Sequence, residues 1–329
     1  MRVRSVGTPP RLPIERDGCA RKAFTAFSRE KLPLGLQIHL QLAVAGLTTG
    51  AVYALIALGF TSVYRATNIL NLAQGDFVML GGLAAVVLLE RVGLPYPVAA
   101  VASIALVTVL GMLLFAGVIR PLRNESLLIL IMATIGASVF FSGSAAILFG
   151  TAPRTLPAFL DHPPLALPGG IRVPVQGLLV LGMTGAVFGG LHLFSRHTDL
   201  GKAMEAVSTD RLGADLVGIP RNLVMVLSFA LSGAVGAVAG IFVTPLFFTQ
   251  YSAGGILGLK GFTAAVIGGW GRYGGAVLGG FLLGVVESLS IGIVPAGYKD
   301  AVAFVLLLAI LYVRPKGVLG SRALEEARK

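Results

Sequence analysis

The sequence contains little charge and almost no cysteine. Its 329 residues include 26 Lys or Arg, 15 Asp or Glu, and a single cysteine, Cys19. One cysteine cannot form a disulfide within the chain, nor can it build a cysteine metal cluster. Charged residues make up 12% of the chain, whereas a typical soluble domain carries about 25%. This composition excludes an ordinary soluble domain.

Motifs of soluble enzymes are also missing. The one Gly-Lys pair, in LGKAM at 200–204, lacks the second glycine and the Ser or Thr of a phosphate-binding loop. No G-x-S-x-G nucleophile elbow occurs. The four histidines do not have metal-site spacing: they are His39, His162, His192 and His197. We therefore expect no catalytic residue, no metal site and no cofactor held by this chain, and we do not expect it to be an enzyme.

Apolar tracts dominate what is present, since 55% of the residues are hydrophobic. A helix needs about 20 apolar residues to cross the hydrocarbon core of a bilayer. Tracts of suitable character lie at 40–64, 74–92, 95–119, 126–149, 174–195, 222–248, 256–270, 275–294 and 300–313. The sequence therefore predicts an all-α polytopic membrane protein, a bundle of about eight or nine transmembrane helices with room for re-entrant or broken segments.

The two ends of the chain differ from this apolar middle. Residues 1–33 contain eight Lys or Arg, three acids and four prolines, without helical periodicity. This composition predicts a basic N-terminal extension without regular structure. An apolar transmembrane domain is expected at 34–320, and a short cytoplasmic tail at 321–329. The net charge of +11 is typical of basic cytoplasmic loops in a membrane protein, so we do not expect nucleic-acid binding.

Basic residues in short loops predict the orientation of the chain. They cluster at 120–123, 196–221 and 314–322, which we place in the cytoplasm. The proline-containing stretch at 150–173 then lies outside. Counting the expected spans backwards from these loops puts the basic N-terminus outside as well. The positive-inside rule disfavours a basic segment on that side. The sequence leaves this conflict open.

Glycine pairs at small-xxx-small spacing occur along the whole chain. Such pairs allow helices to approach closely in lipid, although 44 glycines also produce some of them by chance. The pairs are Gly46/Gly50, Gly185/Gly189, Gly236/Gly240, Gly254/Gly258, Gly275/Gly279 and Gly280/Gly284. Their density favours a compact bundle.

Polar residues interrupt the apolar pattern in NILNLAQGDFVML, residues 68–80. On a helix Asn68, Asn71 and Gln74 would share one face, with Asp76 nearby and Gly75 able to break the helix. Polar or irregular segments at membrane depth occur where they are buried in protein or line a cavity. A broken segment beside a transport path and an interfacial loop are both compatible with this pattern. We take Asn68, Asn71 and Gln74 as candidate path-lining residues.

Two acids lie in or beside later tracts. Glu287, in GGFLLGVVESLSIGIV, is an ionisable group within an expected span, where such groups face a bundle interior or a pathway. It is a further candidate for the path, unless it lies close enough to an interface to be solvated. Asp300 is expected to pair with the adjacent Lys299 at the interface.

The segment GKAMEAVSTDRLGADLVGIP, residues 201–220, is the longest charged stretch in the middle of the chain. Apolar residues recur at helical spacing with charges between them, which predicts an amphipathic helix over about 200–217. Asp199 is the expected cap at its start. The helix is either a solvated connection or a docking element for a cytoplasmic partner.

Three blocks of the sequence resemble a known family. GLTTGAVYALIALGFTSVYRATNILNLAQGDFVMLGG (46–82), GLKGFTAAVIGGWGRYGGAVLGGFLLGVVESL (258–289) and YKDAVAFVLLLAILYVRPKGVLG (298–320) are similar to permease subunits of bacterial branched-chain amino acid ABC transporters. The closing RPKGVLG is similar to the LivH type of this family. The resemblance covers residues 34–320 in consistent order.

The resemblance assigns the segment at 196–221 as a cytoplasmic coupling loop, which in this family docks onto ABC ATPase subunits. Glu205 departs from the basic residue expected at its position, which puts any charge pairing there in doubt. The residues that carry the match, together with Glu205, are Gly201, Ala203, Ala206, Asp210, Ala214, Gly218 and Ile219. Ala206 is the small residue at which we expect close approach to the ATPase.

The resemblance also implies partners and a mechanism. It implies a second, paralogous permease, two ATPase subunits that bind ATP and Mg²⁺, and a periplasmic binding protein, all working by alternating access at the bacterial inner membrane. The expected cargo is a branched-chain or other hydrophobic amino acid, with urea, amides, aromatic acids or a sugar as alternatives. A self-contained channel or secondary transporter is the competing class. The sequence shows no conspicuous set of intramembrane charges for ion coupling, and this counts against that class.

Overall fold

The computed structural model describes residues 34–160, 162–166, 170–292 and 294–320, and these are almost entirely helical. The expected N-terminal extension and C-terminal tail lie outside the described residues. The long helices are α2 (Leu34–Thr67), α3 (Gln74–Glu90), α4 (Tyr96–Leu114), α6 (Leu127–Phe149), α7 (Val175–His197), α10 (Arg221–Val243), α11 (Ala253–Gly268), α12 (Tyr273–Ser290) and α13 (Lys299–Val313). The short elements are a π-helical turn (Phe115–Ile119), α5 (Arg120–Leu122), β1 (Leu165–Ala166), β2 (Arg172–Val173), α8 (Asp199–Thr209), α9 (Arg211–Leu216) and a 3₁₀ turn (Ala296–Tyr298).

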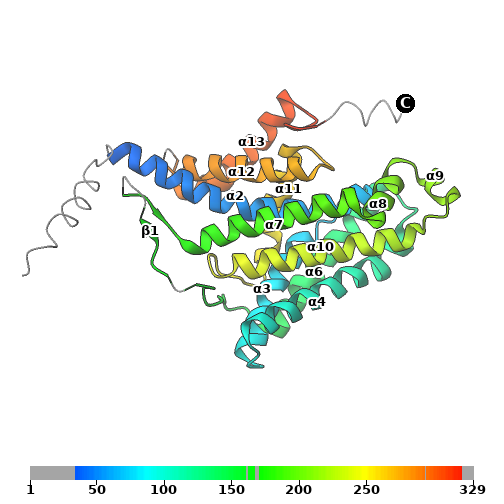
Figure 1. Ribbon diagram of the computed structural model, residues 1–329, viewed down its shortest axis with the longest axis horizontal. Coiled ribbons are helices and arrows are strands. Elements are labelled where there is room, and N and C mark those ends of the chain that lie inside the picture. The colour runs from blue at the N-terminus through cyan, green and yellow to red at the C-terminus, as the bar shows by residue number, and fades with distance from the viewer. Residues whose placement is uncertain (1–33, 161, 167–169, 293, 321–329) are drawn as a thin grey trace, which may run out of the picture.

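Each of the nine apolar tracts contains one of these long helices, so the predicted all-α polytopic class is confirmed (Figure 1). Within the described residues, six helical segments are long and apolar enough to cross a membrane by length and composition: Gly35–Thr67, Tyr96–Leu122, Leu127–Phe149, Val175–His197, Arg221–Val243 and Tyr273–Ser290. The helices α3, α11 and α13 are shorter, with 17, 16 and 15 residues.

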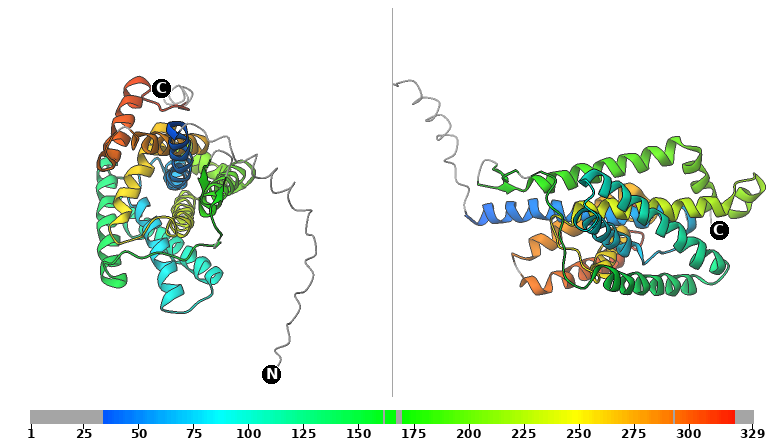
Figure 2. Two further views of the ribbon diagram at one scale, coloured as in Figure 1. Left: turned by 90° about the vertical axis from the view of Figure 1, so that its left-hand side faces the viewer. Right: turned by 90° about the horizontal axis from the view of Figure 1, so that it is seen from below.

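Helix α2 forms the centre of the bundle. Its residues between Ala51 and Phe60 are buried, and it packs against α7, α10, α11 and α12 (Figure 2). The contact with α12 is the closest, because glycine faces glycine: a Cβ added to Gly284 would lie 2.3 Å from the backbone of Gly50. A Cβ on Gly280 would lie 2.4 Å from the backbone nitrogen of Ala54. Small residues thus let two backbones touch where hydrophobic transfer offers little attraction.

Most of the predicted glycine pairs serve such contacts. Gly240 faces Val78 of α3, Gly254 faces Asp76, and Gly279 faces Ala264 of α11. The pair Gly185/Gly189 on α7 behaves differently, since added Cβ atoms there would meet nothing within 4 Å in the described part of the chain. The spacing alone did not distinguish these two cases, because both kinds of pair look the same in sequence.

Side-chain contacts define two ends of the bundle. At one end Gln41 of α2 bonds to Arg172 and Glu90 of α3 pairs with Arg154. At the other end Arg65 of α2 pairs with Glu205 of α8. Figure 1 shows β1 at the left end and α8 and α9 at the right.

The two ends differ strongly in positive charge. Among the described residues, the α8 end carries Arg65, Arg120, Arg123, Arg196, Lys202, Arg211, Arg221, Arg272, Arg314 and Lys316. The opposite end carries Arg91, Arg154, Arg172 and Lys299. The positive-inside rule therefore places α8 and α9 in the cytoplasm and residues 150–173 outside. The start of α2 lies at the same end as residues 150–173, as the backward count from the basic loops expected.

Candidate functional site

The polar motif at 68–80 forms a break between α2 and α3. Asn68 ends α2 in the left-handed region, with φ of 57°, and its backbone N–H donates to the carbonyl of Tyr64 at 2.9 Å. Asparagine tolerates this conformation better than most residues, which explains why the helix stops there. Residues 68–73 are not helical, and α3 begins at Gln74. The expected break is present, but Asn68 produces it and Gly75 lies inside α3.

Neighbouring helices bind the polar groups of this break. The backbone N–H of Leu72 donates to Thr134 Oγ1 of α6 at 3.2 Å, and that of Ala73 donates to Asn71 Oδ1 at 3.3 Å. Gln74 Nε2 donates to the carbonyl of Ser232 in α10 at 3.2 Å. Irregular backbone is therefore held by protein inside the bundle, as non-helical segments at membrane depth require.

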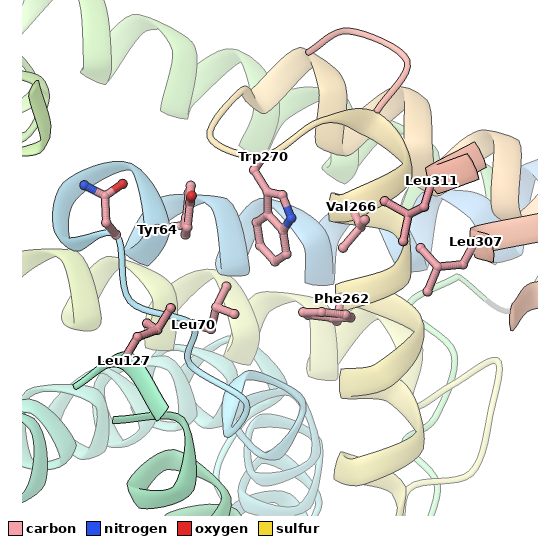
Figure 3. Close-up of a pocket in the computed structure, with 9 residues that line it drawn as sticks. Tyr64, Leu70, Leu127, Phe262, Val266, Trp270, Leu307 and Leu311 are labelled. Atoms are coloured by element: carbon pink, nitrogen blue, oxygen red, sulfur yellow. The ribbon is translucent and has the colours of Figure 1, made fainter. Parts of the chain in front are cut away.

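A cavity of about 410 Å³ opens beside the break, on the cytoplasmic half of the bundle (Figure 3). Helices α2, α6, α11 and α13 contribute to its wall, and Tyr64 and Trp270 face each other with ring centroids 5.0 Å apart. Its lining residues are Tyr64, Asn68, Leu70, Leu127, Phe262, Val266, Trp270, Leu307 and Leu311. A mostly apolar wall with few polar groups is typical of small-molecule sites of this size.

The four candidate path residues are not brought together. Of these four, Asn68 lines the cavity, whereas Asn71 and Gln74 are buried and do not line it. Glu287 lies elsewhere, in contact with α2 and α11. The one-face arrangement expected for the first three residues is wrong, because the chain between Asn68 and Gln74 is not a helix.

Glu287 belongs to a buried charge network that sequence reasoning missed. Lys260 Nζ of α11 donates to Glu287 Oε1 at 2.6 Å and to Tyr53 Oη at 2.9 Å, and Tyr53 Oη donates to Glu287 Oε2 at 2.9 Å. Lys260 Nζ also lies 2.8 Å from Asp300 Oδ1 of α13. Asp300 therefore forms its ion pair with Lys260, whereas the sequence analysis expected Lys299 as its partner. Intramembrane charges are present, so their supposed absence cannot argue against a channel or secondary transporter.

The cytoplasmic segment forms two helices instead of the single helix expected over 200–217. Thr198, not Asp199, caps α8: its Oγ1 accepts from the backbone N–H of Gly201 at 3.0 Å. Asp210 is extended and caps α9 by accepting from the N–H of Leu212 at 3.0 Å. An Asp that caps a new helix competes with the continuation of the old one, which explains the break.

The apolar face of α8 packs within the chain itself. Met204 and Val207 are buried against Ala66 of α2 and Val224 of α10. Met204 and Val207 are therefore not free to enter a groove on an ATPase subunit. The apolar residues left uncovered lie on and just after α9: Leu212, Leu216 and Val217 are 76%, 88% and 75% exposed.

The residues predicted to couple to an ATPase fall into two groups, those packed within the chain and those exposed on its surface. Gly201 is buried, and its Cβ would strike the carbonyl of Phe194 at 2.3 Å. Ala203, Ala214 and Ile219 pack into the cluster around Met204, while Ala206 is half-buried. Glu205, Asp210 and Gly218 are exposed.

Two links join α8 to the cytoplasmic end of α2. Arg65 Nη2 pairs with Glu205 Oε2 at 3.2 Å, and Asn68 Nδ2 donates to the carbonyl of Ser208 at 3.3 Å. Glu205, the departure from the expected basic residue, thus has a partner in its own chain. Because Asn68 also lines the cavity, displacement of α8 would act directly on the cavity wall.

These features define a class of protein. Apolar helices around a broken segment, a cavity beside that break and buried charges are the architecture of a multi-pass membrane transport protein, and the positive-inside rule predicts its orientation. The family of branched-chain amino acid transport system permease components matches residues 42–311. The chain belongs to this family.

Curated relatives agree with this membership. The chain is 34% identical to the high-affinity branched-chain amino acid transport system permease protein BraD of Pseudomonas aeruginosa, over 88% of this chain and 98% of BraD. It is 31% identical to the corresponding permease LivH of Escherichia coli, over 85% of this chain and 95% of LivH. The autoinducer 2 import system permease LsrC of Yersinia enterocolitica is 27% identical, over 80% and 72% of the two chains. The chain is accordingly a multi-pass permease of the bacterial inner membrane.

Proposed function

We propose that this chain is the transmembrane permease subunit of an ATP-driven importer for branched-chain or other hydrophobic amino acids. Its similarity to BraD and LivH exceeds its similarity to LsrC in both identity and coverage, which favours amino acids over other cargo. Separate ATPase subunits supply ATP and Mg²⁺ binding, a second permease completes the pathway, and a periplasmic protein delivers the cargo.

The observation that carries this proposal is the exposed apolar surface of Leu212, Leu216 and Val217 at the cytoplasmic end. Exposed leucines in a charged cytoplasmic segment are costly in water, and they become favourable when a partner covers them. The surrounding polar residues, such as Asp215 and Arg221, form a rim of the kind found around interface cores. A cytoplasmic ATPase subunit is the partner that fits this position.

The contacts between α8 and α2 can transmit movement of an ATPase subunit to the cavity that would hold the cargo. An ATPase that moves α8 pulls on Arg65 and Asn68, and hence on the end of α2 and the wall of the cavity. Alternating access then needs only small shifts of closely packed helices around the break. The cavity suits the apolar side chain of a branched-chain amino acid, because its wall is largely aliphatic and aromatic.

The docking surface is tested with Leu216→Asp. A charge at the centre of an interface removes an apolar contact and requires desolvation, a cost of about 2 kcal/mol or more. We expect ATPase recovery by pull-down to fall at least about tenfold and uptake of radiolabelled L-leucine to fall with it, while the amount of permease in the membrane stays normal. The matched control is Leu165→Asp, an exposed leucine in β1 at the opposite end. Normal ATPase recovery and normal uptake in Leu216→Asp would contradict the docking role.

A further inference from the structure

The carboxylate of Asp76 is buried in the bundle, and no side chain of the described residues forms an ion pair with it. Asp76 is 0% exposed and lies in the first turn of α3. Ser142 Oγ of α6 donates to Asp76 Oδ1 at 3.0 Å, and Ser138 of the same helix lies beside the carboxyl group. In the described part of the chain, Oδ2 has no hydrogen-bond partner. Lys260 is not available to it, because it is engaged with Glu287, Tyr53 and Asp300.

This position is deep in the membrane. Glu90, at the other end of α3, pairs with Arg154 at the outer end of the bundle. The fourteen residues from Asp76 to Glu90 correspond to about 21 Å of helix. An isolated carboxylate at such depth is costly, so its presence points to a ligand that carries the missing positive charge.

Asp76 of α3 packs against the same face of α11 that lines the cavity. Gly254, Gly258, Phe262 and Val266 follow one another at four-residue spacing, which places them along one side of the helix. A Cβ on Gly254 would lie 2.3 Å from Asp76 Oδ1, and one on Gly258 would lie 3.4 Å from Gly75. Phe262 and Val266 line the cavity. Along α11, Gly254 beside the carboxylate is about two helical turns from Phe262 at the cavity.

Asn71, five residues before Asp76 in the same segment, carries a second unpartnered atom. Asn71 is 1% exposed, and its Nδ2 has no hydrogen-bond partner among the described residues. It is a donor, whereas Asp76 Oδ2 is an acceptor. Groups of opposite polarity left open within one short segment match a ligand that carries both an ammonium and a carboxylate group.

We propose that Asp76 binds the α-ammonium group of the transported amino acid as it passes along α11 toward the cavity. A primary ammonium has three N–H donors, and the site offers the free Oδ2 with the hydroxyls of Ser138 and Ser142 beside it. This inference rests on the proposed importer function and narrows its cargo to compounds with a primary ammonium group, which excludes sugars.

The test uses the complete transporter in proteoliposomes, with its partner permease, ATPases and binding protein, and radiolabelled L-leucine as the probe. Asp76→Asn keeps the size of the side chain and an acceptor for Ser142 but removes the charge. We expect leucine uptake to fall about tenfold or more, since a hydrogen bond between charged groups is lost. Asp76→Glu is expected to retain most of the uptake. Glu90→Gln, the same change at the exposed end of α3, is expected to leave it normal.

Thermal stability separates this role from a structural one. Removing an unpaired buried charge should leave the melting temperature of the Asp76→Asn transporter unchanged or higher, while uptake is lost. Near-normal leucine uptake in Asp76→Asn would overturn the proposal. A parallel loss of uptake and stability would overturn it too, because the carboxylate would then only hold helices together. Neither result would affect the importer function itself, which the wild-type uptake measures.

Discussion

Replacing Lys260 with Met is expected to destabilise the folded permease by about 3–5 kcal/mol, the usual cost of leaving a buried charge without its partner. Lys260 provides the positive charge between Glu287 and Asp300, and it also bonds to Tyr53. Without it, the hydroxyl of Tyr53 is the one hydrogen-bond partner that the described residues leave to the carboxylate of the buried Glu287. The four side chains come from α2, α11, α12 and α13, so the loss should loosen several helices at once.

Thermal unfolding of the purified permease in detergent measures this effect. Lys299→Met is the matched control, because Lys299 is an exposed lysine at the start of α13 and its replacement should change stability by less than about 0.5 kcal/mol. The double variant Lys260→Met/Glu287→Met removes the charge pair together and should recover much of the loss. A Lys260→Met protein as stable as the wild type would show that the network contributes nothing to the fold.

Gly280→Val is expected to prevent normal packing of α12 on α2. The new Cβ would lie 2.4 Å from the backbone nitrogen of Ala54, and backbone cannot move aside as a flexible side chain can. Overpacking costs about 1–3 kcal/mol in ordinary cores, and we expect the upper part of this range or more at a backbone contact. The yield and melting temperature of the isolated permease should both fall.

Gly185→Val is the control for this change. It makes the same substitution in another small-xxx-small pair, on α7, where an added Cβ meets nothing within 4 Å in the described part of the chain. The fold of the isolated permease should therefore tolerate it. Equal stability of the two variants would contradict the assignment of the α2–α12 contact.

The helices were predictable because lipid imposes a simple rule on sequence. A stretch that crosses hydrocarbon must be apolar over about 20 residues and must satisfy its backbone internally, and every tract found in this way contains a helix. The break near Asn68 was also visible, since polar residues inside an apolar tract are costly. Its position was misjudged because a glycine was assumed to be the breaker, whereas Asn68 adopts the left-handed conformation.

Contacts between distant residues were not predictable. Glu287 stood out as an isolated charge, but its partner Lys260 lies 27 residues earlier, and Tyr53 lies 234 residues away. Nothing in one sequence records such pairs. For the same reason the amphipathic pattern around Met204 indicated a covered face without showing that α2 and α10 cover it. The uncovered surface on α9 became apparent only in the folded chain.

The buried charges of Lys260, Glu287 and Asp76 are also what an ion-coupled transporter would contain. The energy source must therefore be measured directly, and uptake of radiolabelled L-leucine into proteoliposomes does so. Under the proposed importer function, uptake requires the ATPase subunits, hydrolysable ATP on their side and the binding protein on the other, and we expect no uptake when any of these is omitted. Leucine uptake by this chain alone, driven by a proton or sodium gradient without ATP, would contradict it.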